Sequence, residues 1–348
     1  MDLRWGFLGA GDVTRAKAAA GAAFTFPGSR VVGVACSSVA RAKAYAEAHG
    51  IPRPRETAED LCADSEVDAV YVCTPHHLHA EHVLMAIRAG KHVLCEKPMG
   101  TTTAECVRMA EAANKAGVVL AVAYYRRLYP VIESLRNVIA SGRLGALTTA
   151  QVVKHDYFVP AQETIASDRR SQWRTALGQS GGGTLNEAGS HRLDLLLYLF
   201  GEAASVSAEL DRFAAWYEGE DQASVTIRFR NRLIAQTDHS WCNRTSRDFL
   251  AVTGTAGHAV IEDLEGSLLR LDIGGTTEVL DAGPRPAATH RAVVADFCRA
   301  VATGAPPRCS GWDGLGATQL IQCAYQAARE RRTVDVPAAA KRVNPDVA

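Results

Sequence analysis

Short apolar runs alternate with alanine-rich stretches of helical period along the first third of the chain. Runs rich in β-branched residues predict strands at residues 4–9, 30–36, 69–73, 92–95 and 118–123. The stretches between them predict helices at residues 13–20, 39–49, 80–89 and 102–116. Regular alternation of strand and helix is typical of parallel strands joined by right-handed crossovers. We therefore expect a doubly wound parallel sheet in an N-terminal domain over residues 1–123.

The pattern changes after Ala123. It predicts a helix over residues 130–141, a strand over 147–158, and a helix that ends near Leu199 after three glycines at 181–183. Strand-like runs then follow one another with short turns, at residues 205–210, 224–229, 233–239, 249–253, 259–262 and 268–273. Such close succession indicates a mostly antiparallel sheet. Predicted helices at 290–302 and 313–331 complete a second α/β domain over residues 124–348.

Composition narrows the class of protein. The 348 residues include 38 Lys and Arg against 38 Asp and Glu, so no net charge attracts the chain to nucleic acid or an anionic membrane. Apolar runs stop well short of the roughly 20 residues that span a bilayer, and no basic segment precedes an apolar leader. The nine cysteines lack zinc-ligand spacing. We expect a cytoplasmic protein with reduced thiols and no metal, nucleic-acid or membrane partner.

A glycine-rich turn follows the first predicted strand. Gly9 permits a tight turn and Gly11 lets a pyrophosphate approach the backbone, while the helix N-terminus at Asp12 and Val13 offers free N–H groups. Thr14 stands where a third glycine is usual. Similar turns join strand to helix in many α/β proteins, but the place of this one after the first strand favours dinucleotide binding.

The end of the second strand indicates which dinucleotide is bound. NAD sites carry Asp or Glu there to accept from the ribose 2′-OH, whereas this strand ends in Cys36, Ser37 and Ser38, with Arg41 one helical turn later. A carboxylate would repel a 2′-phosphate, but hydroxyls and a guanidinium bind it. We predict NADP(H) as the favoured cofactor, with NAD(H) as the alternative. If Ser38 only caps the next helix and Arg41 is solvated, the choice stays open.

Two further loops are expected at the same edge of the sheet. The first follows the third strand and is rich in histidine; its candidate cofactor contacts are Thr74, Pro75, His76 and His79. Imidazoles can share a metal ion, but no carboxylate or cysteine lies at ligand spacing, so cofactor contact or helix capping is preferred. The second loop follows the fourth strand, where Glu96 and Lys97 precede Pro98. Its lysine lies beside the ligand crevice, although an exposed turn lysine is the alternative.

The segment after the three glycines carries a candidate acid or base. Glu187, His191 and Asp194 have the spacing i, i+4 and i+7, which places them on one helix face. A neighbouring carboxylate orients an imidazole and raises its proton affinity. The glycines favour close approach of a ligand. The structural alternative is a capping box of Thr184 and Glu187, with His191 as a satisfied core histidine.

With these residues assembled, the chain resembles the Gfo/Idh/MocA family of pyridine-nucleotide-dependent sugar and cyclitol oxidoreductases. The matching segments are the turn at Gly9 and Gly11 and residues 71–98, 123–130 and 173–196. The resemblance implies a Rossmann domain, then an α/β domain whose large open sheet builds a homodimer or homotetramer. It also implies that Lys97 touches the reacting oxygen and the nicotinamide ribose and that His191 passes the proton. The family typically has Asp where this chain has Glu187.

The implied reaction is hydride transfer between nicotinamide and a secondary alcohol or ketone of a sugar, sugar derivative or cyclitol. His191 is the expected acid or base, Lys97 the partner of the oxygen, and Glu187 their neighbour. Candidate pocket residues, each with a structural alternative, are Tyr125, Arg126, Arg127, Tyr157, Trp173 and Asp194. Other hypotheses are a glycosidase acting through a 3-keto intermediate, a non-catalytic nucleotide-sensing regulator, and a dihydrodiol or imine reductase.

Overall fold

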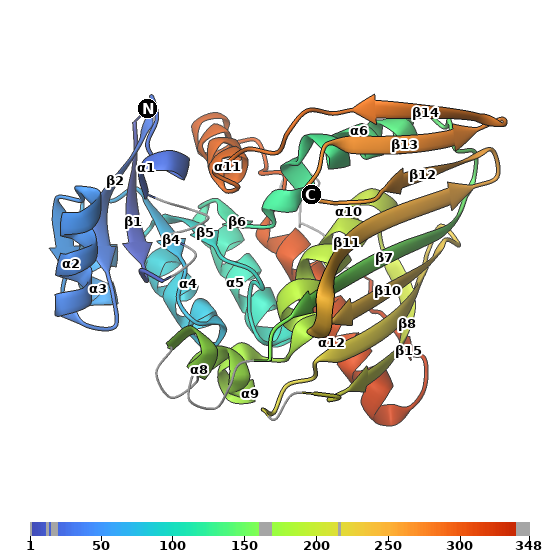
Figure 1. Ribbon diagram of the computed structural model, residues 1–348. Helices are drawn as coiled ribbons and strands as arrows, with labels where there is room; N and C mark the ends of the chain where they lie inside the picture. The colour runs from blue at the N-terminus through green and yellow to red at the C-terminus, as the bar shows by residue number, and fades with distance from the viewer. Residues whose placement is uncertain (1, 12–13, 15–19, 160–168, 215–216, 339–348) are drawn as a thin grey trace.

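Two β-sheets organise the chain in the computed structural model, which describes residues 2–11, 14, 20–159, 169–214 and 217–338 (Figure 1). The first sheet is parallel, with strand order β3-β2-β1-β4-β5-β6. Its strands are β1 (Leu3–Leu8), β2 (Ser29–Ala35), β3 (Arg53–Arg55), β4 (Ala69–Val72), β5 (His92–Cys95) and β6 (Leu120–Val122). Strand order reverses between β1 and β4, so the predicted doubly wound sheet is confirmed.

Helices cover both faces of this sheet. They are α1 (Ala20–Ala23), α2 (Val39–His49), α3 (Ala58–Ala63), α4 (His79–Arg88) and α5 (Thr103–Ala116). Leu61, Val83 and Met109 bury one face beneath α3, α4 and α5, while Phe24, directly after α1, and Tyr45 of α2 pack against the other. The alternation of buried residues along each strand produces these two apolar layers.

Two elements of the first domain were not predicted. Strand β3 has the sequence Arg-Pro-Arg, without apolar alternation, and a proline is tolerated there because the strand lies at the edge. Helix α3 has only six residues and begins at a capping box of Thr57 and Asp60. The helix predicted at 13–20 lies mostly outside the described residues, and α1 begins at Ala20.

The second sheet has strand order β14-β13-β12-β11-β7-β10-β9-β8-β15. Only β10 and β7 pair in parallel among its described strands, so the mostly antiparallel prediction is confirmed. The strands are β7 (Leu147–Tyr157), β8 (Ala203–Asp211), β9 (Gln222–Phe229), β10 (Ile234–Ser240), β11 (Cys242–Gly254), β12 (Gly257–Ile261), β13 (Leu268–Ile273), β14 (Thr276–Asp281) and β15 (Val334–Asp335). The two edge strands β14 and β15 were not predicted.

One face of the second sheet packs on helices that lie between the two sheets (Figure 1). These helices are α6 (Pro130–Ala140), α10 (Ser190–Phe200) and α12 (Gly311–Glu330). Val152, Ile227 and Leu250 from the strands meet Leu193 and Leu320 from the helices in this core. No described helix covers the opposite face (Figure 1), where alternate side chains of β9 and β10 are exposed and polar.

The last two helices in sequence also pack against the first sheet. In α11 (Arg291–Thr303), the Phe297 ring lies 4.9 Å from that of Trp5 in β1. In α12, a Cβ on Gly314 would lie 2.5 Å from a methyl carbon of Val122 in β6, so only glycine permits this approach. Helix α12 is therefore shared by both sheets, since it also contacts β8 and β15, whereas α11 packs on the first sheet.

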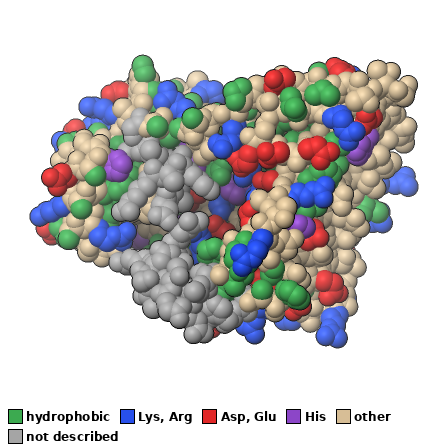
Figure 2. Space-filling view, in the orientation of Figure 1, with side chains coloured by type: hydrophobic (Ala, Val, Ile, Leu, Met, Phe, Trp, Pro, Cys, Tyr) green, Lys and Arg blue, Asp and Glu red, His purple; other side chains and the backbone are tan. Residues whose placement is uncertain are grey.

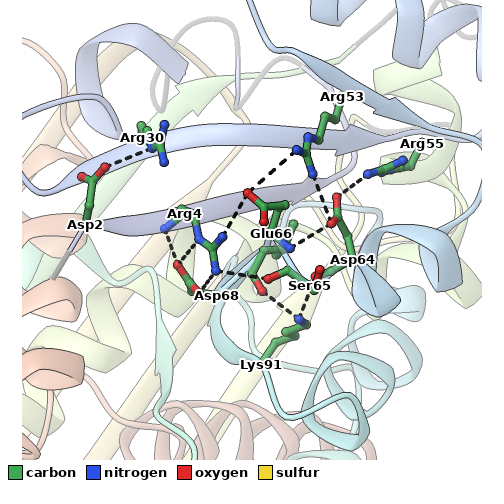
Figure 3. Close-up of polar contacts among 11 residues, drawn as sticks. Asp2, Arg4, Arg30, Arg53, Arg55, Asp64, Ser65, Glu66, Asp68 and Lys91 are labelled. Carbon is green, nitrogen blue, oxygen red and sulfur yellow. Dashed lines mark hydrogen bonds and ion pairs between the residues drawn. The ribbon is translucent and has the colours of Figure 1, made fainter.

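A network of ion pairs closes the first sheet at the amino ends of its strands (Figure 3). Arg4 of β1 pairs with Asp68 at 2.7 Å, and Arg55 of β3 pairs with Asp64. Lys91 donates to the carbonyl oxygens of Asp64 and Val67 at 2.8 and 2.7 Å. These contacts hold the loop that leads into β4, at the edge opposite the carboxyl ends where doubly wound sheets bind ligands.

The surface gives little further indication of a partner. Basic and acidic side chains are interspersed over the face shown in Figure 2, in keeping with the balanced composition. Within the described part of the chain, no helix is both long and apolar enough to cross a bilayer.

Candidate active site

The two glycines of the turn stand at their positions for different reasons. Gly9 has φ +100°, and a Cβ there would lie 2.8 Å from the carbonyl oxygen of Cys73, so the turn itself requires glycine. A Cβ on Gly11 would meet no atom within 4 Å. Among the described residues nothing demands glycine at that position, whereas a phosphate approaching the backbone would. The turn therefore fits a dinucleotide pyrophosphate.

Thr14 fits the position where a third glycine is usual. Its side chain is fully buried, and its hydroxyl donates to the carbonyl oxygen of Gly11 at 2.7 Å. The hydroxyl thus stabilises the turn from within. The predicted cofactor contacts at Asp12 and Val13 lie outside the described residues.

The polar residues at the end of β2 cap the next helix and also contact the glycine turn. Ser38 caps α2 by accepting from the backbone N–H of Arg41. The Arg41 guanidinium folds back, donating to the hydroxyl of Ser37 at 2.8 Å and to the carbonyl oxygen of Ala10 in the glycine turn at 3.2 Å. A fixed cation and an exposed hydroxyl therefore stand beside the turn.

Lys97 joins the first sheet to the second domain. It follows β5, and its ammonium donates to the backbone carbonyl of Glu187 at 3.0 Å, with the carboxylate of the same residue at 3.4 Å. Arg174 of α8 (Arg169–Thr175) reaches that carboxylate at 3.0 Å, and the His76 ring lies 3.5 Å from it. Three elements therefore meet at Glu187.

His191 lies in α10, two residues after the end of η4 (Leu185–Gly189), the π-helical turn that precedes this helix. Its side chain is 5% exposed, and its ring makes edge contacts with Tyr124 and Tyr125, at centroid distances of 5.8 and 5.0 Å. Asp194, expected on the same helix face, forms a buried ion pair with Arg127 at 2.7 Å. The two carboxylates near His191 in sequence thus have partners on other elements.

The capping box considered for Thr184 is not formed. The Thr184 side chain makes no cap hydrogen bond, and the distant Glu220 instead accepts from the backbone N–H groups of Gly183 and Leu185, both at 2.9 Å. A Cβ on Gly183 would lie 1.9 Å from the carbonyl oxygen of Glu220. At Gly183, therefore, the chain's own backbone fills the space that was expected to admit a ligand.

The histidine-rich loop forms η2 (His76–Leu78) after Pro75 and ties neighbouring loops together. His76 contacts the carbonyl oxygen of Ser180 at 2.8 Å, and burial lowers its pKa to about 3, so the ring is neutral. His79 lies 2.9 Å from the carbonyl oxygens of both Thr74 and Pro98, and burial lowers its pKa as well. Among the described residues, no group of three or more His, Cys, Asp or Glu could hold a metal ion.

The predicted pocket residues are distributed over several places. Trp173 packs edge-on against His76 at 4.7 Å, beside the Glu187 cluster. Arg126 pairs with Glu265 and lies 3.6 Å from Asp248, yet its Nε and Nη1 have no hydrogen-bond acceptor among the described residues. Tyr157, at the end of β7, is 45% exposed and contacts Arg244. These substrate assignments stay predictions.

Sequence reasoning missed two contributors to the site. Arg174 is one, although it adjoins the predicted Trp173; its Nε and Nη1 are buried without a hydrogen-bond acceptor among the described residues. His290 is the other, and its Nε2 lies 2.6 Å from Glu96. Burial favours a neutral carboxyl, but the adjacent His290 and the hydroxyl of Tyr71 lower the pKa of Glu96 to about 2. A buried glutamate needs a partner, but only the fold could reveal one 194 residues away.

Comparison with known proteins agrees with this geometry. The 1,5-anhydro-D-fructose reductase of Ensifer adhaerens is 31% identical over 96% of this chain and 98% of its own length. The trans-1,2-dihydrobenzene-1,2-diol dehydrogenase of Sus scrofa is 32% identical over 76% of this chain and 75% of its own.

Solved structures share the fold across nearly the whole chain. Aldose-aldose oxidoreductase from Caulobacter crescentus, complexed with glycerol, has a TM-score of 0.85 at 29% identity, covering 96% of this chain and 100% of that one. Levoglucosan dehydrogenase in complex with NADH and levoglucosan has a TM-score of 0.86 over 97% and 100% of the two chains; at 23% identity this shows the fold alone.

Family models cover both halves of the molecule. The Gfo/Idh/MocA model described as an oxidoreductase family with an NAD-binding Rossmann fold matches residues 3–124. The model for the family's C-terminal alpha/beta domain matches residues 136–336. The chain therefore belongs to the Gfo/Idh/MocA oxidoreductase family.

Proposed function

We propose that this protein transfers a hydride between a nicotinamide cofactor and a secondary alcohol or ketone of a sugar, sugar derivative or cyclitol. The observation that carries the proposal is the contact of Lys97, at the carboxyl end of β5, with Glu187, four residues before His191. It brings an ammonium and an imidazole-bearing helix to the edge of the sheet that holds the glycine turn. The sugar-acting relatives support the substrate class.

His191 and Lys97 have complementary roles in this proposal. The imidazole takes the hydroxyl proton during oxidation or returns it during reduction. The Lys97 ammonium donates to the same oxygen and stabilises the negative charge that develops on it. Glu187 lies between Lys97 and Arg174 and holds the ammonium in place.

The glycine turn and the end of β2 would hold the cofactor, whose nicotinamide donates or accepts the hydride when bound. The backbone at Gly11 lies open to the pyrophosphate. Ser37 and Arg41 offer a hydroxyl and a guanidinium to a 2′-phosphate, which favours NADP(H) over NAD(H). The two buried N–H groups of Arg174 without an acceptor in the described chain suit an anionic or polar group of a bound ligand.

A dihydrodiol is the second candidate substrate. Relatives from several mammals are trans-1,2-dihydrobenzene-1,2-diol dehydrogenases at 30 to 34% identity. Trp173 lies beside the Glu187 cluster, where its ring can contact a flat cyclohexadiene as well as a sugar ring. Arg126, whose buried Nε and Nη1 lack an acceptor in the described chain, would bind substrate hydroxyls in either case.

Titration with NADPH and NADH, followed by a substrate panel, tests both candidates. We expect tighter binding of NADPH and absorbance change at the reduced-nicotinamide band with a sugar or cyclitol. Turnover of dihydrodiols alone would favour the second candidate. Glycosidic cleavage without net change in the cofactor, or nucleotide binding without any turnover, would contradict the proposal.

We further propose that the uncovered face of the second sheet pairs with another copy of the chain, as a homodimer or homotetramer. This face exposes large apolar side chains such as Leu268 and holds a hollow of about 480 Å³ lined by polar residues, apart from the Lys97 site. Sedimentation at several concentrations measures the assembly.

All nine cysteines are free thiols, which supports a reducing, cytoplasmic location.

A further inference from the structure

Glu96 and His290 form a buried pair between the first sheet and the start of α11. The Nε2 of His290 lies 2.6 Å from one carboxylate oxygen of Glu96, with 1% and 7% of the two side chains exposed. The hydroxyl of Tyr71 donates to the same oxygen at 2.5 Å. Because Glu96 stays ionised, His290 must be the donor in this contact.

The second carboxylate oxygen of Glu96 faces the reacting lysine. It accepts from the backbone N–H of Lys97 at 3.2 Å. The ammonium at the other end of Lys97 lies 3.0 Å from the carbonyl oxygen of Glu187. Glu96 therefore fixes the backbone from which the Lys97 side chain extends, and His290 fixes Glu96.

The ring of His290 also supports His191. It packs against Tyr125 at a centroid distance of 4.7 Å, and Tyr125 makes an edge contact with His191 at 5.0 Å. Tyr125 is 3% exposed, so its ring cannot turn away without disturbing the core. A displacement of His290 would reach His191 through this one ring.

We infer that His290 is a positioning residue for the reaction proposed above, on which this inference rests. Its Nε2–H holds Glu96 and so the backbone of Lys97, while its ring holds Tyr125 against His191. A single side chain from the C-terminal part of the sequence thus aligns both groups that act on the substrate oxygen. A solely structural role would join α11 to the sheet without affecting turnover.

The test compares two substitutions of His290 whose side-chain amides differ in length. In His290→Gln the side-chain N–H still reaches Glu96, whereas in His290→Asn it is too short. We expect kcat to fall about 10- to 100-fold in His290→Asn, as small misplacements of reacting groups do, and to stay within about fivefold of wild type in His290→Gln. The Kd for NADPH should change less than about twofold in both, because the cofactor turn lies on other strands.

A stability control separates positioning from folding. Phe297→Leu removes packing in the same helix, where Phe297 is fully buried against Trp5, without touching Glu96. It should lower Tm while leaving kcat unchanged. If His290→Asn fails to fold, Tyr71→Phe carries the comparison, since it removes only the second donor to Glu96; kcat should fall about fivefold.

Three results would overturn the inference. Equal kcat values in His290→Gln and His290→Asn, or an unchanged kcat in Tyr71→Phe, would show that the contacts with Glu96 do not act on turnover. Absence of nucleotide-dependent turnover in the unmodified protein would instead defeat the proposed function, and this inference with it. The first two results appear only among variants and the third already in wild type, so they are distinguishable.

Discussion

Glu187 has one methylene more than the aspartate typical of its family, and the structure gives that extra length a use. Its carboxylate lies within 3.5 Å of Lys97, Arg174 and His76, each on a different element. One anion between two permanent cations keeps both side chains oriented with little freedom. The residue type and spacing indicated a polar site in the sequence, but the partners of Glu187 depend on the fold.

Replacing Lys97 by Met should remove the charge that we propose stabilises the substrate oxygen, while retaining an unbranched side chain. We expect kcat/KM to fall about 100- to 1000-fold, the usual cost of losing one oxyanion donor. The Kd for NADPH should change less than kcat/KM, because Gly9, Gly11 and Arg41 still hold the dinucleotide and Lys97 is expected only at the nicotinamide ribose. Steady-state kinetics and nucleotide titration measure the two quantities. Lys115→Met, at an exposed position of α5, is the matched control; near-normal turnover in Lys97→Met would refute the role.

Arg41 and Ser37 provide the corresponding test for the cofactor. Arg41→Ala should weaken NADPH binding about tenfold, since a hydrogen bond to a charged group contributes about 1.5–3 kcal/mol, and should leave NADH binding nearly unchanged. Ser37→Asp should go further and reverse the preference, because its carboxylate repels a 2′-phosphate and accepts from a 2′-OH. Fluorescence titration of both nucleotides measures this. Equal effects on NADPH and NADH would contradict 2′-phosphate recognition.

At the scale of elements, the sequence pattern predicted those strands and helices whose formation depends on nearby residues. The long strands of both sheets and the helices between them follow from period and turn residues. The missed elements β3, α3, β14 and β15 are short or lie at edges, where little apolar alternation is needed. The capping box considered as an alternative before His191 does not form, because Glu220, the actual partner of that turn, is more distant in sequence. The contact of His290 with Glu96 was missed because 194 residues separate the two.

Alanine should have different effects at two glycines that both lie in loops: Gly183→Ala should lower stability, whereas Gly11→Ala should weaken nucleotide binding. Gly183→Ala places a Cβ 1.9 Å from the carbonyl oxygen of Glu220, so we expect a loss of about 1–3 kcal/mol in the free energy of unfolding. Gly11→Ala meets no atom within 4 Å and should leave Tm unchanged while weakening nucleotide binding about tenfold or more. Thermal unfolding and titration of each variant measure this. A lower Tm without weaker nucleotide binding in Gly11→Ala would contradict the assignment.

At the scale of the whole molecule, stability should depend on the ion-pair network at the amino ends of the first sheet. Burial opposes ionisation of Asp64 and Asp68, but Arg55 and Arg4 respectively lower the pKa of each below its ordinary 3.8. The folded state therefore binds protons less readily than the unfolded chain. The stability contributed by these carboxylates is fully present above about pH 4 and is lost as the pH falls through their lowered folded pKa values.

Asp68→Asn tests this contribution. The variant should have a lower free energy of unfolding than wild type near neutral pH, and the two curves should converge at low pH, where wild-type Asp68 is protonated. Urea unfolding at a series of pH values gives both curves. Asp335→Asn, at an exposed position in β15, is the control and should follow wild type throughout. A constant difference between Asp68→Asn and wild type at every pH would contradict the linkage.

The late place of α11 in the sequence has a consequence for biosynthesis. Trp5 is synthesised long before Phe297, whose ring covers it from α11. Until then Trp5 lacks part of its apolar cover, although Phe24 already packs against it, and His290 cannot yet reach Glu96. Nascent chains therefore expose apolar surface of the first sheet until α11 has been made, and exposed apolar surface is what chaperones bind. The geometry proposed for catalysis is completed only after α11 has been synthesised.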